Sequence, residues 1–196
     1  MASTRENKTI SQFKSQLIGG GARPNLFEVE LTTLPAGIAW PSDNFRYMCK
    51  AAQLPASVIA NIDIPFRGRI FKVAGDRTIE PWSITVINDE DFRIRKAMEE
   101  WVDRIAKLEN NLGATDPSAY MVNAKVFQLG RGATVSSSTN AGDRNAVLRE
   151  YEFIDIFPTS VSSIDLSYDS SDTIEEFVVD FAVQSFKFVD AGGPNG

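Results

Sequence analysis

The sequence predicts a mainly β fold that carries one long helix. Apolar and polar residues alternate with a period of two over several stretches of the 196-residue chain, as in strands with one buried face. Residues 89–108 instead keep apolar side chains at helical spacing over several turns. A hydrophobic content of 43% is sufficient for a core, and the length favours one folded domain.

The first predicted strand begins at Leu26, and apolar and acidic residues alternate from there to Leu31. A loop containing two prolines and a glycine follows over residues 32–44. Alternation then resumes at Phe45, Tyr47 and Cys49, which predicts a second strand paired with the first.

A hairpin is predicted over residues 59–73. Its two apolar runs, 59–66 and 69–73, are separated by Arg67-Gly68, a tight-turn signal. Gly75-Asp76 is then expected to turn the chain into a strand over residues 82–87, which are rich in β-branched and aromatic side chains.

The long helix is predicted over residues 89–108. Asn88 or Asp89 can cap its first turn, and basic residues near its end complement the helix dipole. Gly113 and Pro117 are expected to separate it from the following strand.

Three further strands are expected after the helix. Residues 120–129 and 147–157 read as an antiparallel pair joined by a Gly/Ser/Thr/Asn-rich loop over residues 130–145. A last hairpin would pair residues 163–168 with a long strand over residues 174–189. Because that strand is apolar on both faces, it needs cover from its own domain or from a partner.

An amphipathic helix is predicted over residues 9–18, where Thr9 and Gln12 have the spacing of a capping box and three glycines follow. It either packs on its own domain or docks on a neighbouring subunit. The predicted organisation is therefore an N-terminal arm (1–21), one β domain (22–190) and a C-terminal tail (191–196).

Composition excludes several classes of function. The net charge of −6 without a basic cluster argues against binding nucleic acid through its phosphates. The absence of histidine removes Ser-His-Asp and Cys-His catalysis and the commonest metal ligand. The single cysteine forms no internal disulfide, and no stretch approaches the roughly 20 apolar residues that span a membrane. We expect no signal peptide, cofactor or metal, and folding in the cytoplasm.

Motifs for phosphate or calcium binding are incomplete. The glycines at 19–21 and 130–132 lack the residues that follow in a P-loop or a dinucleotide fingerprint. The sequence DSSD at 169–172 begins like a calcium loop, but Ile174 stands where the sharp turn needs glycine. The acids at 89–91 are read as helix-dipole partners rather than a catalytic cluster.

Several segments together resemble the tail tube proteins of contractile-tailed, T-even-like bacteriophages. They are ARPNLF at 22–27, CKAAQLP at 49–55, VAGDRT at 73–78, WSITVINDE at 82–90, FPTSV at 157–161, LSYDS at 166–170 and IEEF at 174–177. In order they cover most of residues 22–183. The arm, the loops at 32–44 and 130–145 and the tail at 191–196 depart from the family pattern.

The resemblance implies an antiparallel β-sandwich or small barrel with one packed helix, forming hexameric rings that stack into a tube. It implies a virion protein that conducts genomic DNA without binding it specifically. It also implies the tail sheath protein, baseplate hub, tape-measure protein and tail terminator as partners. The tube component of a type VI secretion-like system, or of another contractile injection system, is the alternative with the same fold.

Two sets of functional residues follow as expectations. The candidate lumen acids lie on the polar phases of strands; they are Glu28, Glu30, Glu150, Glu152, Asp155, Glu176 and Asp180. The candidate assembly contacts are apolar or basic residues of the arm, the hairpin and the long strand; they are Ile10, Phe13, Leu17, Ile62, Ile64, Phe66, Arg67, Arg69, Phe71, Phe177 and Val179.

Two other classes share the predicted fold. One is a carboxylate-dependent enzyme and the other a monomeric binding module. Rings or tubes would support a structural protein, whereas a persistent monomer at high concentration would favour the binding module.

Overall fold

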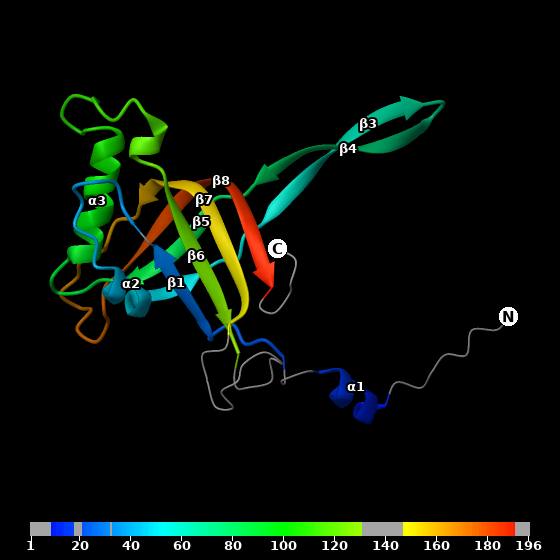
Figure 1. Ribbon diagram of the computed structural model, residues 1–196, viewed down its shortest axis with the longest axis horizontal. Helices are drawn as coiled ribbons and strands as arrows, with labels where there is room; N and C mark the ends of the chain where they lie inside the picture. The colour runs from blue at the N-terminus through cyan, green and yellow to red at the C-terminus, as the bar shows by residue number, and fades with distance from the viewer. Residues whose placement is uncertain (1–8, 18–20, 32, 131–146, 191–196) are drawn as a thin grey trace. The chain divides into compact units, whose positions relative to one another are not determined.

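The computed structural model describes residues 9–17, 21–31, 33–130 and 147–190 (Figure 1). The chain divides into two compact units, one of residues 28–126 with 151–188 and one of residues 1–27, 127–150 and 189–196. The helices are α1 (Ile10–Gln16), α2 (Ser42–Met48) and α3 (Arg93–Ile105), with a 3-10 turn at Pro117–Ala119. The strands are β1 (Phe27–Leu31), β2 (Cys49–Ala52), β3 (Ser57–Phe66), β4 (Arg69–Ile79), β5 (Trp82–Ile87), β6 (Val122–Leu129), β7 (Val147–Val161) and β8 (Glu176–Asp190).

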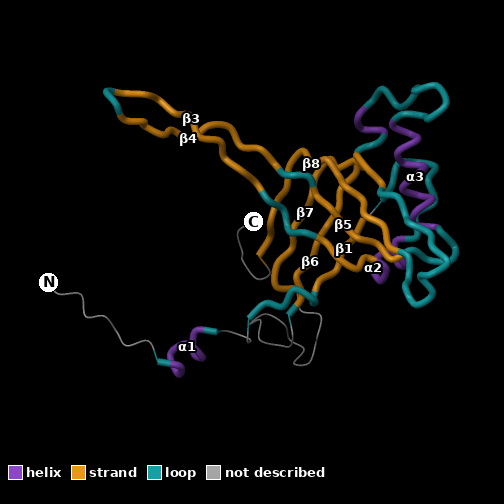
Figure 2. The backbone as a smooth tube through the Cα atoms, turned by 180° about the vertical axis from the view of Figure 1, so that it is seen from behind, coloured by secondary structure: helices purple, strands orange, loops and turns teal. Residues whose placement is uncertain are grey.

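Six strands form one sheet in the order β1-β6-β7-β8-β5-β2, while β3 and β4 form a separate two-stranded sheet. Figures 1 and 2 show the six strands curving into a nearly closed, barrel-like sheet. The mainly β prediction with one packed helix is confirmed. The predicted pairing of the first two strands is wrong, because β1 and β2 lie at opposite ends of the sheet and β2 pairs with β5.

The core lies on one face of this sheet and under α3. Buried aromatic and branched side chains alternate along β5 and along β8 from Glu176 to Phe181, and α3 adds Ile94, Ala97, Met98 and Trp101. Trp82 stacks on Phe153 with ring centroids 4.4 Å apart and lies 5.3 Å from Phe181. Because these aromatic rings come from β5, β7 and β8, their packing fixes the middle of the sheet.

Each tryptophan also donates its indole N–H to a backbone carbonyl outside its own element. Trp82 bonds Gln53 at 2.9 Å, Trp101 bonds Tyr120 at 2.7 Å and Trp40 bonds Leu31 at 3.0 Å. A buried indole N–H requires such a partner. These bonds therefore tie the base of the β3–β4 hairpin, the approach to β6 and the end of β1 to the core.

The predicted second strand is a helix over most of its length. Residues 42–48 form α2, and only the four residues of β2 extend the chain toward the hairpin. Phe45 is buried and its ring lies 4.9 Å from Trp40, while Tyr47 is exposed. The alternation at 45, 47 and 49 is also compatible with a helix that buries one position per turn, and the structure has a helix there.

The long helix is shorter than predicted and begins differently. Phe92, in the left-handed conformation with φ of 52°, precedes α3, and no side chain caps the first turn. Asp89 instead accepts a hydrogen bond from the Asn44 amide at 3.0 Å. The predicted cap is therefore wrong, because the Asp89 side chain accepts from Asn44 within α2 and not from the first turn of α3.

The predicted hairpin is confirmed and is longer than expected. Arg67 and Gly68 both have positive φ, as a type I′ turn requires. Gly75 does not turn the chain, because β4 continues to Ile79. The register shifts opposite Ala60, and a Cβ at Gly75 would lie 3.0 Å from the Ala60 carbonyl oxygen, so glycine permits a bulge there.

The predicted C-terminal hairpin has the wrong first strand. Residues 163–168 are not a strand, and β8 pairs with β7 and β5. A bulge at Asp155, with φ of 54°, changes the phase of β7, so that Phe153 and Ile156 are both buried. The predicted loop at 130–145 lies outside the described residues apart from Gly130, as do Gly19-Gly20 and the tail at 191–196. The division into arm, single domain and tail stays a prediction.

Trp82→Phe should destabilise the fold by about 2 kcal/mol or more, because it leaves the Gln53 carbonyl without its donor and opens a void beside Phe153. Trp40→Phe is the matched control, since it also removes one indole bond but at a half-buried position. Urea denaturation of the dispersed subunit measures both free energies of unfolding. Equal losses would contradict the central place of Trp82.

Cys49 should be unreactive in the native protein. Burial raises the pKa of the Cys49 thiol from 9.0 to about 12, and the thiolate is the reactive form. We expect modification by a disulfide reagent at pH 8 to be at least ~100-fold slower than in denatured protein. Because the folded pKa is raised, the associated stability is complete below pH 9 and declines as pH rises toward 12. Cys49→Ala should remove this part of the pH dependence, and rapid native modification would contradict the burial.

Candidate assembly surfaces and the acidic sheet face

The candidate lumen acids of β1 and β8 lie on the sheet face opposite the core. Glu28 and Glu30 alternate with the buried residues of β1, and Glu176 and Asp180 alternate with those of β8. Successive side chains of a strand point to opposite faces, so burial of one phase places the acids on the other. We call this surface the acidic face.

Basic residues of the α2–β2 segment compensate part of the acidic face. The Arg46 guanidinium lies 2.9 Å from Glu30 and 3.3 Å from Glu28, and Lys50 lies 2.5 Å from Glu176. The hydrogen bond and charge of Glu30 raise the pKa of Arg46. These pairs connect α2 to β1 and β2 to β8, so α2 and β2 help to close the barrel-like sheet.

Asp180 differs from these acids because its described partners are neutral. Its carboxylate accepts hydrogen bonds from the hydroxyls of Ser83 and, at 2.9 Å, of Ser160. The hydroxyls orient the carboxylate without cancelling its charge. Asp180 is therefore a fixed negative charge in the middle of the acidic face.

The three acids of β7 occupy different settings. Glu150 and Glu152 share one phase of the strand and are both half-buried. Asp155 is exposed at the bulge, where its backbone N–H donates to the Asn123 side chain at 3.1 Å. Among the candidate lumen acids, Glu152 and Asp155 are the two for which the described part of the chain gives no side-chain partner.

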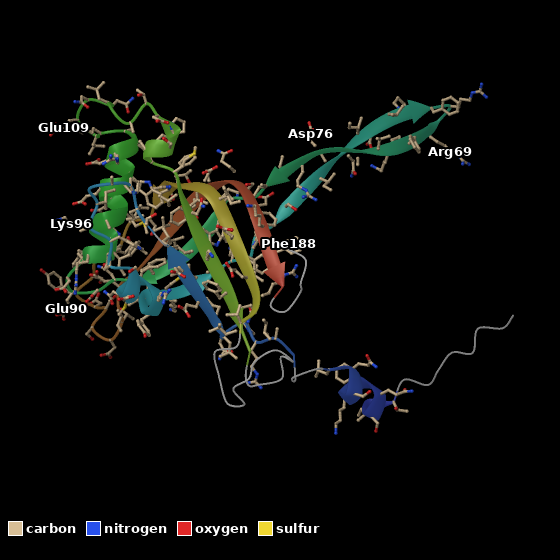
Figure 3. The ribbon with its side chains drawn as sticks, viewed as in Figure 1. Arg69, Asp76, Glu90, Lys96, Glu109 and Phe188 are labelled. Atoms are coloured by element: carbon tan, nitrogen blue, oxygen red, sulfur yellow. The ribbon has the colours of Figure 1, made fainter. Side chains whose placement is uncertain are left out.

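The hairpin exposes apolar side chains on both of its faces. Ile62, Ile64, Phe66 and Phe71 are all about half exposed or more, with Phe66 at 65%. The tip adds Arg67, whose guanidinium carbon lies 5.3 Å from the Phe66 ring centre, and Arg69. Figure 3 labels Arg69 at this tip. Such a concentration of exposed apolar area is typical of an interaction surface.

α1 presents the arm's candidate contacts to solvent. The capping box of Thr9 and Gln12 is confirmed, with the Thr9 amide 2.9 Å from the Gln12 side-chain oxygen. Ile10 is 76% exposed, and Phe13 and Leu17 are also exposed. No residue of α1 is buried, so within the described chain its apolar face is unpartnered.

Two of the candidate assembly contacts are buried in the core and are not available at the surface of the subunit. Phe177 is 1% exposed and Val179 is fully buried, because β8 is an interior strand whose apolar phase forms the core. The phase of β8 that contains both residues is therefore accounted for within the chain. Its neighbours are β7 and β5, so β8 offers no free edge to another subunit.

Sequence reasoning missed an exposed apolar set in the connection between β7 and β8. Leu166, Tyr168 and Ile174 are largely or fully exposed there. The sequence predicts that they lie in the two strands of the C-terminal hairpin, where alternation would bury one phase. Their signal was available, since they are large apolar residues among three aspartates and a glutamate at 165–175.

The described residues give no sign of a metal centre or membrane span. No cluster of three or more Cys, Asp or Glu side chains is arranged to hold a metal ion among them. None of their helices is both long and apolar enough to cross a membrane. The features that remain are the acidic face and the exposed apolar hairpin.

Comparison with known proteins identifies a family from the sequence and finds similar folds among solved structures. The family model described as phage tail tube protein matches residues 22–189. Tail tube protein gp19 of Enterobacteria phage T4 is 34% identical over 165 residues, which are 84% of this chain and 90% of that protein. Two cryo-EM structures of the anti-feeding prophage are similar in fold. The six-fold symmetrised baseplate gives a TM-score of 0.62 at 10% identity, covering 88% of this chain and 98% of that one. The tube-terminating cap gives 0.57 at 16%, covering 97% and 100%.

The matched span includes α3, the β3–β4 hairpin and the six-stranded sheet up to residue 189, but not α1. At this identity and coverage, the chain belongs to the phage tail tube protein family.

Proposed function

We propose that this protein is a structural subunit that polymerises as stacked hexameric rings into the inner tail tube of a contractile phage tail. The observation that carries the proposal is the 34% identity to the T4 tail tube protein over 84% of the chain. The tube would be the conduit for DNA ejection. The subunit would be a virion component, assembled in the host cytoplasm, with no catalytic role.

The exposed apolar surfaces support polymerisation. Eight large apolar residues of the hairpin and three of the arm segment are exposed. Such surface is costly to leave in water at roughly 25 cal/mol per Å², and burial against other subunits removes that cost. The six-fold symmetry of the structurally similar baseplate supports rings of six.

The acidic face supports the role of DNA conduit if it lines the lumen. Six copies at −6 would carry about −36 per ring. A wall of that sign offers DNA no release of counterions and therefore no incentive to adhere. Glu152, Asp155 and Asp180 are the acids we expect to contribute most, because the described structure gives them no cationic partner.

The proposed partners follow from this position in the tail. They are further copies of the chain, the tail sheath protein outside, the baseplate hub below, the tail terminator above, and the tape-measure protein and then DNA inside. The terminating cap and baseplate among the structurally similar chains support contacts at the two tube ends.

A second candidate is the tube of a type VI secretion-like or other contractile injection system. The anti-feeding prophage structures favour considering it, because they share the fold at low identity. Recovery of the chain from particles that contain DNA would favour the phage tail, and recovery from DNA-free injection particles would favour this alternative.

Purified protein should form rings or tubes in negative-stain micrographs. Deletion of residues 1–18 should leave a folded subunit that polymerises poorly, because it removes Ile10, Phe13 and Leu17 from the proposed contacts. Circular dichroism checks the fold of the truncated chain. A full-length protein that stays monomeric at high concentration would refute the proposed function. Normal tubes from the truncated chain would refute only the role of the arm.

The lumen proposal predicts a charge-dependent rate of DNA ejection. Glu152→Lys combined with Asp155→Asn should leave tube assembly intact but slow ejection several-fold, most strongly at low salt where screening is weakest. Asp155→Asn retains a residue that tolerates positive φ. The control makes the same charge change at Glu109 and Asp103, which lie after and within α3 and not on the sheet. Equal ejection rates in both variants would place the acidic face away from the lumen.

A further inference from the structure

α1 has an apolar face that its own subunit leaves uncovered. Ile10, Phe13 and Leu17 recur at helical spacing, all three are exposed, and no residue of α1 is buried. Lys14 lies one turn after Ile10 at the edge of this face, and the described residues give it no ion pair. A helix of seven residues is marginal in water even with its capping box. A surface that covers the apolar face would therefore stabilise α1.

The segment that contains α1 is basic and lies outside the family match. Residues 1–17 contain three basic side chains and one acidic side chain. The family model begins to match at residue 22, so membership of the family assigns no role to α1. The chemistry of the segment indicates its partner. Such a partner has exposed apolar side chains for the apolar face, bordered by carboxylates for the basic residues.

A surface of this composition lies where β5 ends and β8 begins. These two strand ends are paired, and Asn88 donates from its backbone and from its side chain to Glu175, both at 2.8 Å. The contact joins residues 88–92 to residues 162–175, and we call the combined surface the acidic end. It contains seven carboxylates and no lysine or arginine. Figure 3 labels one of its acids, Glu90.

The acidic end also exposes apolar area. Leu166 is 81% exposed, Ile174 is 72% exposed, and the Tyr168 side chain is fully exposed. The described residues give no ion pair to the aspartates between and beside these side chains, which are Asp165, Asp169 and Asp172. The surface therefore combines uncompensated negative charge with apolar area.

The other exposed apolar groups of the described chain fit a basic helix less well. The hairpin carries Arg67 and Arg69 beside its apolar residues, and like charges would repel the arm. The loop after α3 exposes Leu108 between Lys107 and Glu109, so its charges are mixed. Among these surfaces, the acidic end is the one whose charged residues are all carboxylates.

We propose that α1 of one copy docks on the acidic end of a neighbouring copy. Its apolar face covers Leu166, Tyr168 and Ile174, and Lys14 lies among the aspartates. The contact is between copies, because both surfaces are exposed in the single subunit. The ten residues between α1 and β1 can extend to at most ~35 Å, a reach that suits an adjacent subunit. The inference rests on the proposed assembly into rings and tubes and adds a contact to it.

Charge reversal tests the pairing. K8E with K14E, and separately D169K with D172K, should each raise the protein concentration needed for polymerisation at least ~10-fold, because many such contacts act together in a tube. A chain with all four substitutions should polymerise within ~3-fold of the wild-type concentration, since each reversed surface then meets its complement. K107E with K187E makes the same change in net charge elsewhere and should polymerise normally. Circular dichroism checks that each variant is folded.

The outcomes separate this inference from the proposed function. Normal polymerisation of either reversed pair, an equal loss in the control, or no recovery in the chain with four substitutions would overturn the inference. Tubes formed by the wild-type protein would leave the proposed function standing in each of these cases. A wild-type protein that forms neither rings nor tubes would overturn the proposed function itself.

Cross-linking gives a second readout that does not depend on charge. The photoreactive residue p-benzoylphenylalanine in place of Phe13 keeps an aromatic, apolar side chain on the apolar face. Illuminated tubes should contain covalent dimers, and mass spectrometry should place the link within residues 162–175. The same residue in place of Leu108, which is 95% exposed, is the control and should give no link to that segment. A link within one subunit, a link to another segment, or no link in visible tubes would overturn the inference.

Discussion

The packing of Trp82 is the interaction on which the rest of the structure depends. Its ring stacks on Phe153 of β7 and lies beside Phe181 of β8, while its N–H bonds the Gln53 carbonyl at the base of the hairpin. One buried side chain therefore fixes three sheet strands and the root of a hairpin that has little other support. The hairpin depends on such an anchor because its own residues are nearly all exposed.

The six-stranded sheet has apolar side chains on its buried face and polar side chains on the other. The apolar phases of β5 and β8 form the core, so their polar phases are left to define the outer surface. That surface carries the acids Glu28, Glu30 and Asp180, and α2 and β2 place Arg46 and Lys50 against its acids. The apolar residues that remain exposed belong mainly to the hairpin and the β7–β8 connection, which the core does not need. The residues that stabilise the fold are thus distinct from the exposed apolar residues.

Local patterns predicted the elements whose cause is local. β5 was predicted at residues 82–87 because its alternation matches one buried face, and the hairpin turn because Arg67-Gly68 can adopt positive φ. α2 was missed because a seven-residue helix buries only Phe45 and is stabilised by distant partners, Glu28 and Glu30, through Arg46. The partner of β8 was also missed, because pairing across the sheet is not encoded in the spacing of neighbouring residues.

The sequence could predict which acids share a face of a strand, but not which of them are neutralised by a basic partner. Strand phase identified the acids, yet the charge that a surface presents depends on which acids are paired. Glu176 is compensated by Lys50, 126 positions away in sequence, whereas Asp180 is held by two hydroxyls and keeps its charge. The same argument applies to the long strand. Its two-sided apolar character suggested an intersubunit contact, but the core and the adjacent strands of the same chain already satisfy Phe177 and Val179. Folding thus leaves exposed a different set of apolar side chains, of which the largest group lies on the β3–β4 hairpin.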